Sequence, residues 1–195
     1  MSDERNFYRL LGLSELVSIS ELCEAAIARK PERVKMQKES TLELEGDGWH
    51  VYVSLKLKPA RARWRVGHEL AHWYFDRIGH QSDRIEQECD ALGAALCVPG
   101  ALVNEAWGLF GEDLKSAADW LGTTQSLVLL RYGECVVTGV SGTAVIESSK
   151  VIARSDWDWP IEEEIRKAEG PGLKHVRIDD EAKRAGLIVK EEKAG

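Results

Sequence analysis

The sequence predicts an α+β fold, and three observations lead to that prediction. Residues 61–78 have the apolar spacing of a long helix, and a turn signal at residues 46–48 separates two runs that alternate like hairpin strands. After residue 134, glycine and serine break the chain into short β-like runs. A length of 195 residues allows one compact domain, or one domain with a small appendage. We expect a core over 1–110, a helical segment over 111–133 and a β-rich region over 134–195.

The expected core begins with a helix at residues 7–30, where apolar positions recur with a period near 3.6. Residues 33–45 alternate loosely and predict a strand or two. Residues 49–57 alternate clearly and predict the second strand of a hairpin that turns at 46–48. His50 lies alone in this second strand, and we expect it on the solvent side.

The helix at 61–78 contains the motif around which the rest of the chain is organised, His68-Glu69-Leu70-Ala71-His72. Positions i and i+4 of a helix are about 400° of rotation apart, so both imidazoles leave the same face. Two neutral imidazoles at this spacing suit one zinc ion, and Glu69 is placed to act as a general base. The alternative is an amphipathic helix that carries two surface histidines. The flanking apolar residues argue against it, because they indicate a half-buried helix.

A second helix is predicted from Asp83 to residue 98, and it offers two carboxylates as the third zinc ligand. Glu86 already has a local role, since Asp83 and Glu86 have the spacing of a capping box. Glu88 lies roughly 70° from the centre of the apolar stripe, where a charged group needs a partner or a metal. We therefore prefer Glu88 and keep Glu86 in reserve. His80 lies just past the end of the preceding helix and is left out of the site.

Residues 111–131 have the length and rhythm of a helix-turn-helix, with a turn at Gly122 and a cap at Thr123 or Thr124. A DNA-reading helix needs polar side chains that face the groove, and this one offers chiefly Gln125 and Ser126. The net charge of −7 also opposes binding to phosphates, which only a strongly basic local patch would reverse. We expect a helical hairpin that packs on the core, and no direct binding of nucleic acid.

The C-terminal region is predicted from composition alone. Residues 135–154 read as a meander of short strands, 161–169 as a short charged helix, and 175–178 and 187–189 as late strands. The tail from residue 190 is expected to fray. No motif assigns a role to this region.

The remaining composition predicts a soluble cytoplasmic protein. The four cysteines have no CxxC spacing and stand among apolar neighbours, as buried reduced thiols do. The N-terminus lacks the basic and apolar runs of a signal peptide, and no stretch approaches the ~18 apolar residues of a membrane span.

The histidine motif, the later run Glu86-Gln-Glu-Cys-Asp-Ala-Leu-Gly-Ala-Ala-Leu-Cys-Val-Pro99 and the helix-turn-helix that follows together resemble the ImmA/IrrE family of metallopeptidases. That family shows an HExxH helix and then a segment near E-x-E-A-N/D-x-F-A-x-x-L-L-x-P. The resemblance covers about residues 42–131. Cys89 replaces the family's alanine, and Leu92-Gly93 replaces Phe-Ala. Both departures concern packing and leave the metal-binding residues intact.

The resemblance implies a zincin-like core with a small antiparallel sheet and an active-site helix. His68 and His72 match zinc ligands, Glu69 matches the catalytic base, and Glu88 matches the third ligand. Asp90 matches the Asn or Asp beside that ligand, in a supporting role. No residue that would stabilise an oxyanion can be assigned.

The family resemblance further implies a regulatory protease that cleaves helix-turn-helix repressors, often encoded in mobile elements or stress regulons. By analogy with other zincins, the substrate would pair with an edge strand, for which we expect residues 49–57. Two alternatives remain. One is a DNA-binding regulator whose metal site is structural or vestigial, and the other is an interaction protein that keeps the fold without turnover.

Overall fold

The computed structural model describes residues 3–14, 16–135, 140–147, 150–154, 173–177 and 184–190. The chain divides into two compact units, Met1–Pro99 and Gly100–Gly195. The first domain was expected over residues 1–110, whereas the helix between 100 and 110 belongs to the second unit. The mixture of helices and small sheets confirms the predicted α+β class.

The first unit begins with two helices, α1 (Asp3–Leu10) and α2 (Ile19–Ile27), so the prediction of one continuous helix over 7–30 was wrong. A capping box defines the start of α2. The Ser18 hydroxyl accepts from the backbone N–H of Glu21, and the Glu21 side chain accepts from the backbone N–H of Ser18. These bonds satisfy helix donors that would otherwise lack partners, which fixes a new helix start within the predicted one.

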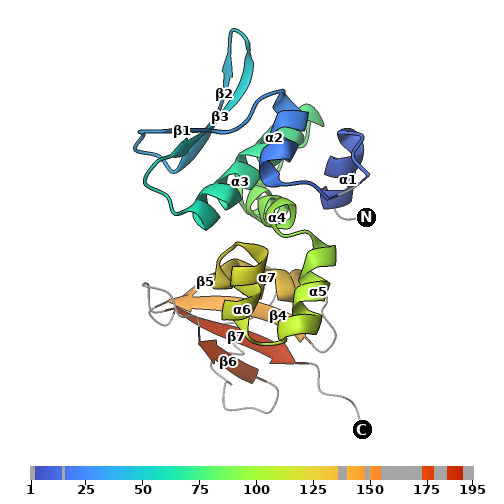
Figure 1. The fold of residues 1–195 in the computed structure, drawn as a ribbon, viewed down its shortest axis with the longest axis vertical. Helices are drawn as coiled ribbons and strands as arrows, with labels where there is room; N and C mark the ends of the chain where they lie inside the picture. The colour runs from blue at the N-terminus through green and yellow to red at the C-terminus, as the bar shows by residue number, and fades with distance from the viewer. Residues whose placement is uncertain are drawn as a thin grey trace. The chain divides into compact units, whose positions relative to one another are not determined.

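A three-stranded sheet follows, formed by β1 (Glu32–Val34), β2 (Ser40–Glu45) and β3 (Gly48–Ser54) in the order β1-β3-β2 (Figure 1). The predicted hairpin is confirmed, with β2 antiparallel to β3. The parallel pairing of β1 with β3 was not predicted, and it puts β3 in the centre of the sheet. The expectation that residues 49–57 form an edge strand is therefore wrong, and β2 is the edge strand of the hairpin.

The expectation that His50 faces solvent was also wrong, because only 6% of this residue is exposed. Its ring stacks on Tyr52, with the centroids 5.7 Å apart. Its Nε2 lies 2.8 Å from Asp47 Oδ1 in the hairpin turn. Strand alternation does set the faces, but the turn carboxylate and the tyrosine ring cover the face that His50 occupies.

The long helix α3 (Pro59–Arg77) contacts β2, β3, α2 and the next helix, α4 (Ile85–Cys97). Glycines allow α3 and α4 to approach closely. A Cβ on Gly93 would lie 2.6 Å from the backbone nitrogen of His68, and a Cβ on Gly67 would lie 2.6 Å from the carbonyl oxygen of Gly93. Such distances exclude any side chain at either position unless the backbones move apart.

The second unit contains three helices and a four-stranded sheet in the order β5-β4-β7-β6, with all pairs antiparallel. The elements are α5 (Gly100–Phe110), α6 (Leu114–Leu121), α7 (Gln125–Glu134), β4 (Val140–Glu147), β5 (Lys150–Arg154), β6 (Leu173–Arg177) and β7 (Arg184–Lys190). Strands β4 and β5 confirm the strands predicted within 140–154, β6 and β7 confirm the late strands, and residues 136–139 of the predicted meander lie outside the described residues. The predicted helix at 161–169 and the tail after 190 lie outside the described residues.

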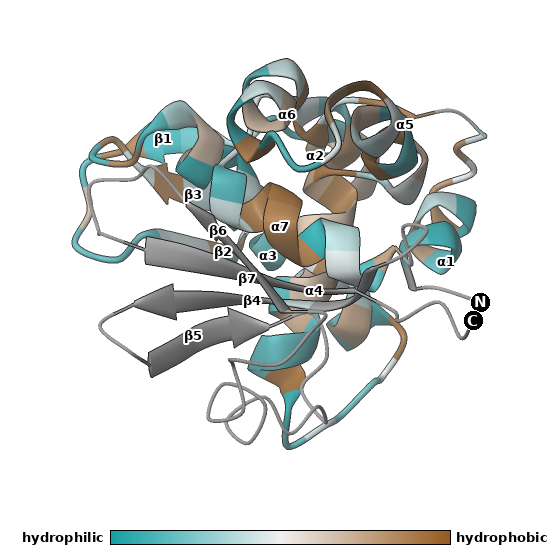
Figure 2. Cartoon of the chain, turned by 90° about the horizontal axis from the view of Figure 1, so that it is seen from below, coloured by the Kyte–Doolittle hydropathy of each residue, from teal (hydrophilic) through white to brown (hydrophobic). Residues whose placement is uncertain are grey.

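The predicted helix-turn-helix is present in α6 and α7. Gly122 ends α6 in the left-handed conformation at φ 63°, and the Thr124 hydroxyl caps α7 by accepting from the backbone N–H of Leu127. Hydrophobic residues run along the middle of α7 (Figure 2). This helix contacts α5, α6, β4 and β7, so its apolar residues pack inside the second unit.

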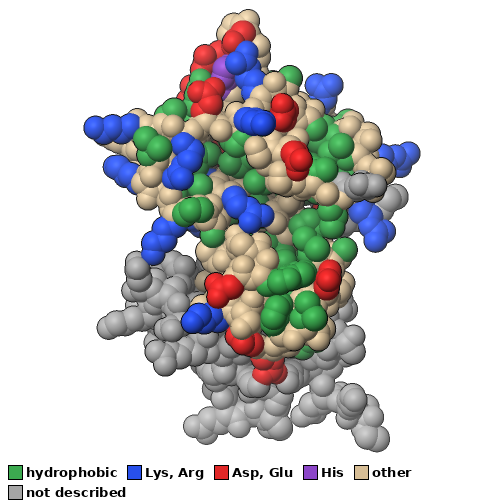
Figure 3. Space-filling model, in the orientation of Figure 1, with side chains coloured by type: hydrophobic (Ala, Val, Ile, Leu, Met, Phe, Trp, Pro, Cys, Tyr) green, Lys and Arg blue, Asp and Glu red, His purple; other side chains and the backbone are tan. Residues whose placement is uncertain are grey.

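The surface of the first unit is unevenly charged. On the left of Figure 3, several lysine and arginine side chains lie with no acidic side chain among them, and further basic side chains lie on the right. Among the residues that the structure describes, no single helix is long and apolar enough to cross a membrane, although α4 and α5 taken together have the length and composition.

Candidate metal centre

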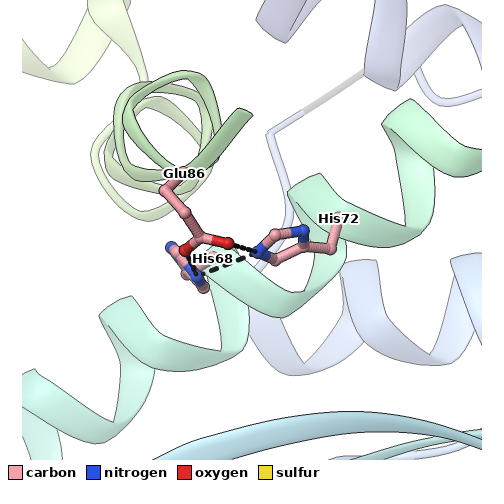
Figure 4. A group of neighbouring side chains, drawn as sticks. All are labelled: His68, His72 and Glu86. Carbon is pink, nitrogen blue, oxygen red and sulfur yellow. Dashed lines mark hydrogen bonds and ion pairs between the residues drawn. The ribbon is translucent and has the colours of Figure 1, made fainter. Parts of the chain in front are cut away.

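Helices α3 and α4 bring together three side chains that could hold a metal ion, His68, His72 and Glu86 (Figure 4). The two histidines lie one turn apart on α3, as their spacing predicts, and Glu86 lies in the first turn of α4. The Nε2 atoms of the two histidines are 3.1 Å apart. The Glu86 oxygens lie 3.5 Å from Nε2 of His68 and 3.4 Å from Nε2 of His72.

These distances suit a shared zinc ion. Zinc binds nitrogen and oxygen at about 2.0–2.2 Å, and tetrahedral angles then separate neighbouring ligand atoms by roughly 3.4 Å. The three distances from 3.1 to 3.5 Å match that separation. Two imidazoles and one carboxylate are also a ligand set that zinc accepts with a fourth position left open. The residues present therefore fit the metal.

The sequence analysis preferred Glu88 as the third ligand, but the structure brings Glu86 to the histidines instead. Glu88 Oε2 lies 2.6 Å from His80 Nε2, and its Oε1 accepts a 2.8 Å hydrogen bond from the Ser82 hydroxyl. The hydrogen bond with His80, followed by that with Ser82, lowers the pKa of Glu88 below its usual range. This carboxylate is thus held by the loop between α3 and α4.

Helix geometry explains why only one of the two carboxylates reaches α3. Two residues along a helix turn the side chain by about 200°, so Glu86 and Glu88 leave nearly opposite faces of α4. Glu88 was preferred because Glu86 was expected to form a capping box with Asp83. The capping box does not form, because α4 begins at Ile85 with Arg84 at the N-cap position and no side-chain cap. Glu86 consequently faces α3.

Asp90 lies one turn after Glu86 and approaches the other side of the His68 ring. Its Oδ1 is 2.7 Å from Nδ1 of His68. This contact has the length of an ion pair, but the ring N–H is not aligned with the oxygen as a hydrogen bond requires. A carboxylate on Nδ1 favours the tautomer that presents Nε2 to a metal. His68 itself is buried, with 5% exposed, and its ring lies against Trp64.

Glu69 follows His68 on α3 and lies toward the sheet. It is buried, with 8% exposed, and its Oε1 accepts a 2.5 Å hydrogen bond from the Ser40 hydroxyl. Ser40 is the first residue of β2 and pairs with Val53, so it lies on the sheet face that packs against α3. Sequence reasoning missed Ser40. Only the pairing register of the hairpin, which brings Ser40 opposite the buried Val53, could have indicated its position.

The chain matches the IrrE N-terminal-like domain, Peptidase_M78, over residues 30–131. It belongs to this family. The match confirms the resemblance that the histidine motif and the following acidic segment indicate, and it supports a metallopeptidase or regulatory role. No curated protein is significantly similar in sequence to this Peptidase_M78 chain.

The fold is also similar to that of a solved Mycobacterium tuberculosis transcriptional regulator. The TM-score is 0.63 at 10% sequence identity, and the match covers 96% of this chain and 74% of that chain. At such low identity the likeness concerns the fold alone. It extends beyond the family domain and includes most of the second unit.

Proposed function

We propose that this Peptidase_M78 chain is a zinc-dependent endopeptidase that cleaves a specific protein. The observation that carries the proposal is the set of three donor atoms on His68, His72 and Glu86, which lie 3.1–3.5 Å apart beside the buried carboxylate of Glu69. Among the described residues, Glu86 has no lysine or arginine partner that would compete with a metal.

The residues have distinct roles in this proposal. His68, His72 and Glu86 would hold the zinc, and Asp90 would orient the His68 ring. Zinc bound there would act as a Lewis acid toward the peptide carbonyl and lower the pKa of a water molecule. Glu69 would accept the proton of the attacking water. Because Ser40 occupies Oε1 of Glu69, Oε2 is the oxygen left for that proton.

The substrate would pair with β2. Within the described sheet, β2 pairs on one side only, with β3, so its other edge has backbone donors and acceptors available for β-augmentation. Ser40 at the start of β2 contacts Glu69, so a peptide on this edge would pass the base. The family resemblance points to a helix-turn-helix repressor as the substrate, and cleavage of a repressor would make the enzyme a regulator of transcription.

The alternative is a DNA-binding regulator with a vestigial metal site. The burial of the α7 side chains argues against it. Leu127, Val128, Leu129, Arg131 and Tyr132 are buried. Arg131 is the only basic residue in the last turn of α7, and it pairs with Glu134 at 2.6 Å. A recognition helix must present polar side chains to the groove, whereas α7 presents most of its surface to its own unit.

Metal analysis and cleavage together test the proposal. We expect about one zinc per chain, lost in His72→Ala, because a ligand is removed. Glu69→Gln should keep the zinc and lose cleavage of a helix-turn-helix repressor encoded beside the gene, since the base is absent but the ligands remain. Full cleavage by Glu69→Gln would refute the proposed mechanism.

A further inference from the structure

The end of the sheet beside the candidate site carries a cluster of exposed cations. Parallel strands end on the same side, so the chain leaves β1 and β3 at one end of the sheet and starts α3 close by. We call the exposed side chains there the basic surface, which consists of Arg33, Lys35, Lys38, Lys56, Lys58 and Arg61. Figure 3 shows several lysine and arginine side chains on the left of the first unit, and others on its right.

The basic surface includes two loops, one after β1 and one after β3, and hydrogen bonds connect them. Arg33 Nη2 donates to the carbonyl oxygens of Leu57 at 2.6 Å and Leu55 at 3.2 Å. The Leu55 N–H donates to the carbonyl oxygen of Val34 at 2.9 Å, and the Ser54 hydroxyl donates to that of Met36 at 3.5 Å. The lysine backbones are therefore held in place, and a ligand would not have to order the loops.

Three of the six cations of the basic surface, Lys35, Lys38 and Lys56, carry the positive charge on which a ligand could act. The neighbouring carboxylate of Glu39 is bonded by Arg61 at 2.8 Å and by Arg65 Nε at 2.6 Å. Burial raises the pKa of Glu39, but the two arginines more than offset this and hold it below its usual value, so Glu39 is ionised and already paired. Among the described residues, Lys35, Lys38 and Lys56 have no ion-pair partner.

The basic surface also adjoins the edge strand on which a substrate would lie. Glu39 and Ser40 are neighbours in the chain, and Ser40 donates its hydroxyl hydrogen to Glu69. The exposed Lys38 comes just before this pair. A peptide that pairs with β2 and continues past Ser40 would therefore meet the basic surface within a few residues.

We propose that the basic surface binds an acidic segment of the protein substrate. This inference rests on the proposed endopeptidase function and adds a rule of substrate selection to it. A short acidic peptide matches the surface better than a nucleic acid does. The net charge of −7 includes these six positive charges, so the other residues of the chain together carry a charge of −13. This negative charge repels a long polyphosphate.

The test measures binding by the full chain in the Glu69→Gln background, so that nothing is cleaved. The probe is a short fluorescein-labelled peptide of alternating glutamate and serine, followed by fluorescence anisotropy at low ionic strength. Lys35→Gln, Lys38→Gln and Lys56→Gln combined should weaken binding about tenfold, as the loss of three exposed charge contacts predicts. The matched control combines Arg5→Gln, Arg9→Gln and Lys115→Gln, which removes the same charge elsewhere and should change binding by no more than about twofold.

Three results would overturn the inference. They are no binding of the acidic peptide, equal weakening in the test and control variants, and tighter binding of a duplex DNA of equal charge than of the peptide. The readout needs neither metal nor cleavage, so it is independent of catalysis. If the peptide binds as expected but the wild type cleaves no protein, the endopeptidase proposal fails and the acidic-ligand site stands.

Discussion

The first unit contains two groups of histidine and carboxylate side chains. They differ in whether other residues of the protein supply hydrogen bonds and counter-charges to these side chains. One is the candidate metal centre between α3 and α4. The other is a hairpin cluster of Glu45, Asp47 and His50 at the tip of β2 and β3, where ligand atoms also lie within 4.8 Å of one another. By composition alone, both groups could bind a divalent cation.

In the hairpin cluster, the protein supplies the hydrogen bonds and counter-charges. Asp47 Oδ1 is 2.8 Å from His50 Nε2, and Asp47 Oδ2 is 2.5 Å from the Arg29 guanidinium. Tyr52 donates a 2.6 Å hydrogen bond to Glu45. A metal would have to displace these partners.

In the candidate metal centre, by contrast, the donor atoms of His68, His72 and Glu86 face one another. Among the described residues, the ion pairs of the Glu86 carboxylate are those with the two histidines, and 69% of its side chain is exposed. The contrast shows that ligand type and proximity do not define a metal site. Donor atoms that converge without a cationic or hydrogen-bonding partner from the protein are the more specific signal.

The largest expected effect separates the two neighbouring carboxylates of α4. Glu86→Gln should reduce zinc affinity by more than the roughly 10–100-fold that loss of a supporting partner causes, because it removes a ligand. Glu88→Gln should change the affinity by no more than about threefold, since it alters only the contacts with His80 and Ser82. Competition with a chromophoric chelator measures both. The reverse ranking would restore Glu88 as the ligand and break the comparison.

A smaller effect is expected where the backbones of α3 and α4 meet. Gly93→Ala introduces a Cβ that would lie 2.6 Å from the His68 nitrogen, so the helices must separate. We expect a loss of about 1–3 kcal/mol in the free energy of unfolding, measured by urea denaturation, together with weaker zinc binding. Gly108→Ala in α5 is the control. A Cβ there meets nothing within 4 Å, and the substitution should stabilise by up to about 1 kcal/mol. Equal stability of wild type and Gly93→Ala would contradict the close approach.

The smallest effect concerns pH and the hairpin cluster. The hydrogen bond with Asp47 raises the pKa of His50 above 6.5, and the same bond lowers the pKa of Asp47 below 3.8. The stabilisation is therefore complete between the ordinary pKa values of aspartate and histidine, and it is lost as pH rises through the raised pKa of His50. At the acid end it is lost as pH falls through the lowered pKa of Asp47.

Thermal unfolding at about pH 5 and about pH 8 checks this prediction. Asp47→Asn should lower the midpoint temperature of unfolding more at the lower pH than at the higher pH. The control Asp76→Asn, also at an exposed aspartate of the first unit, should change the midpoint equally at both. A larger loss at the higher pH would mean that His50 is not held protonated by Asp47.

Much of the fold follows from signals that lie within a few residues of one another. The motif at 68–72 predicts its helix, Gly46-Asp47-Gly48 predicts the hairpin, and Gly122 with Thr124 predicts the turn between α6 and α7. Each signal is local, because helix caps and tight turns depend on the residues that form them. The same holds for His68, Glu69 and His72, whose relative placement is set by one helix.

The parts that sequence reasoning missed depend on contacts between distant segments. The central position of β3 depends on its pairing with β1, and the place of Glu86 depends on how α4 lies against α3. The choice between Glu86 and Glu88 further depended on a capping box that matched in spacing but did not form. A spacing shows what is possible locally, whereas packing decides which side chain meets another helix.

The register of the hairpin has a consequence at its far end. Ser40 reaches Glu69 because it pairs with Val53, and the two-residue connection at Gly46 and Asp47 sets that pairing. Adding one residue to the connection would shift β2 and exchange its two faces. A neighbour of Ser40 would then meet Glu69, and a glutamate in that position would repel the carboxylate. The number of residues at the hairpin tip thus governs the chemistry available to a side chain at its base.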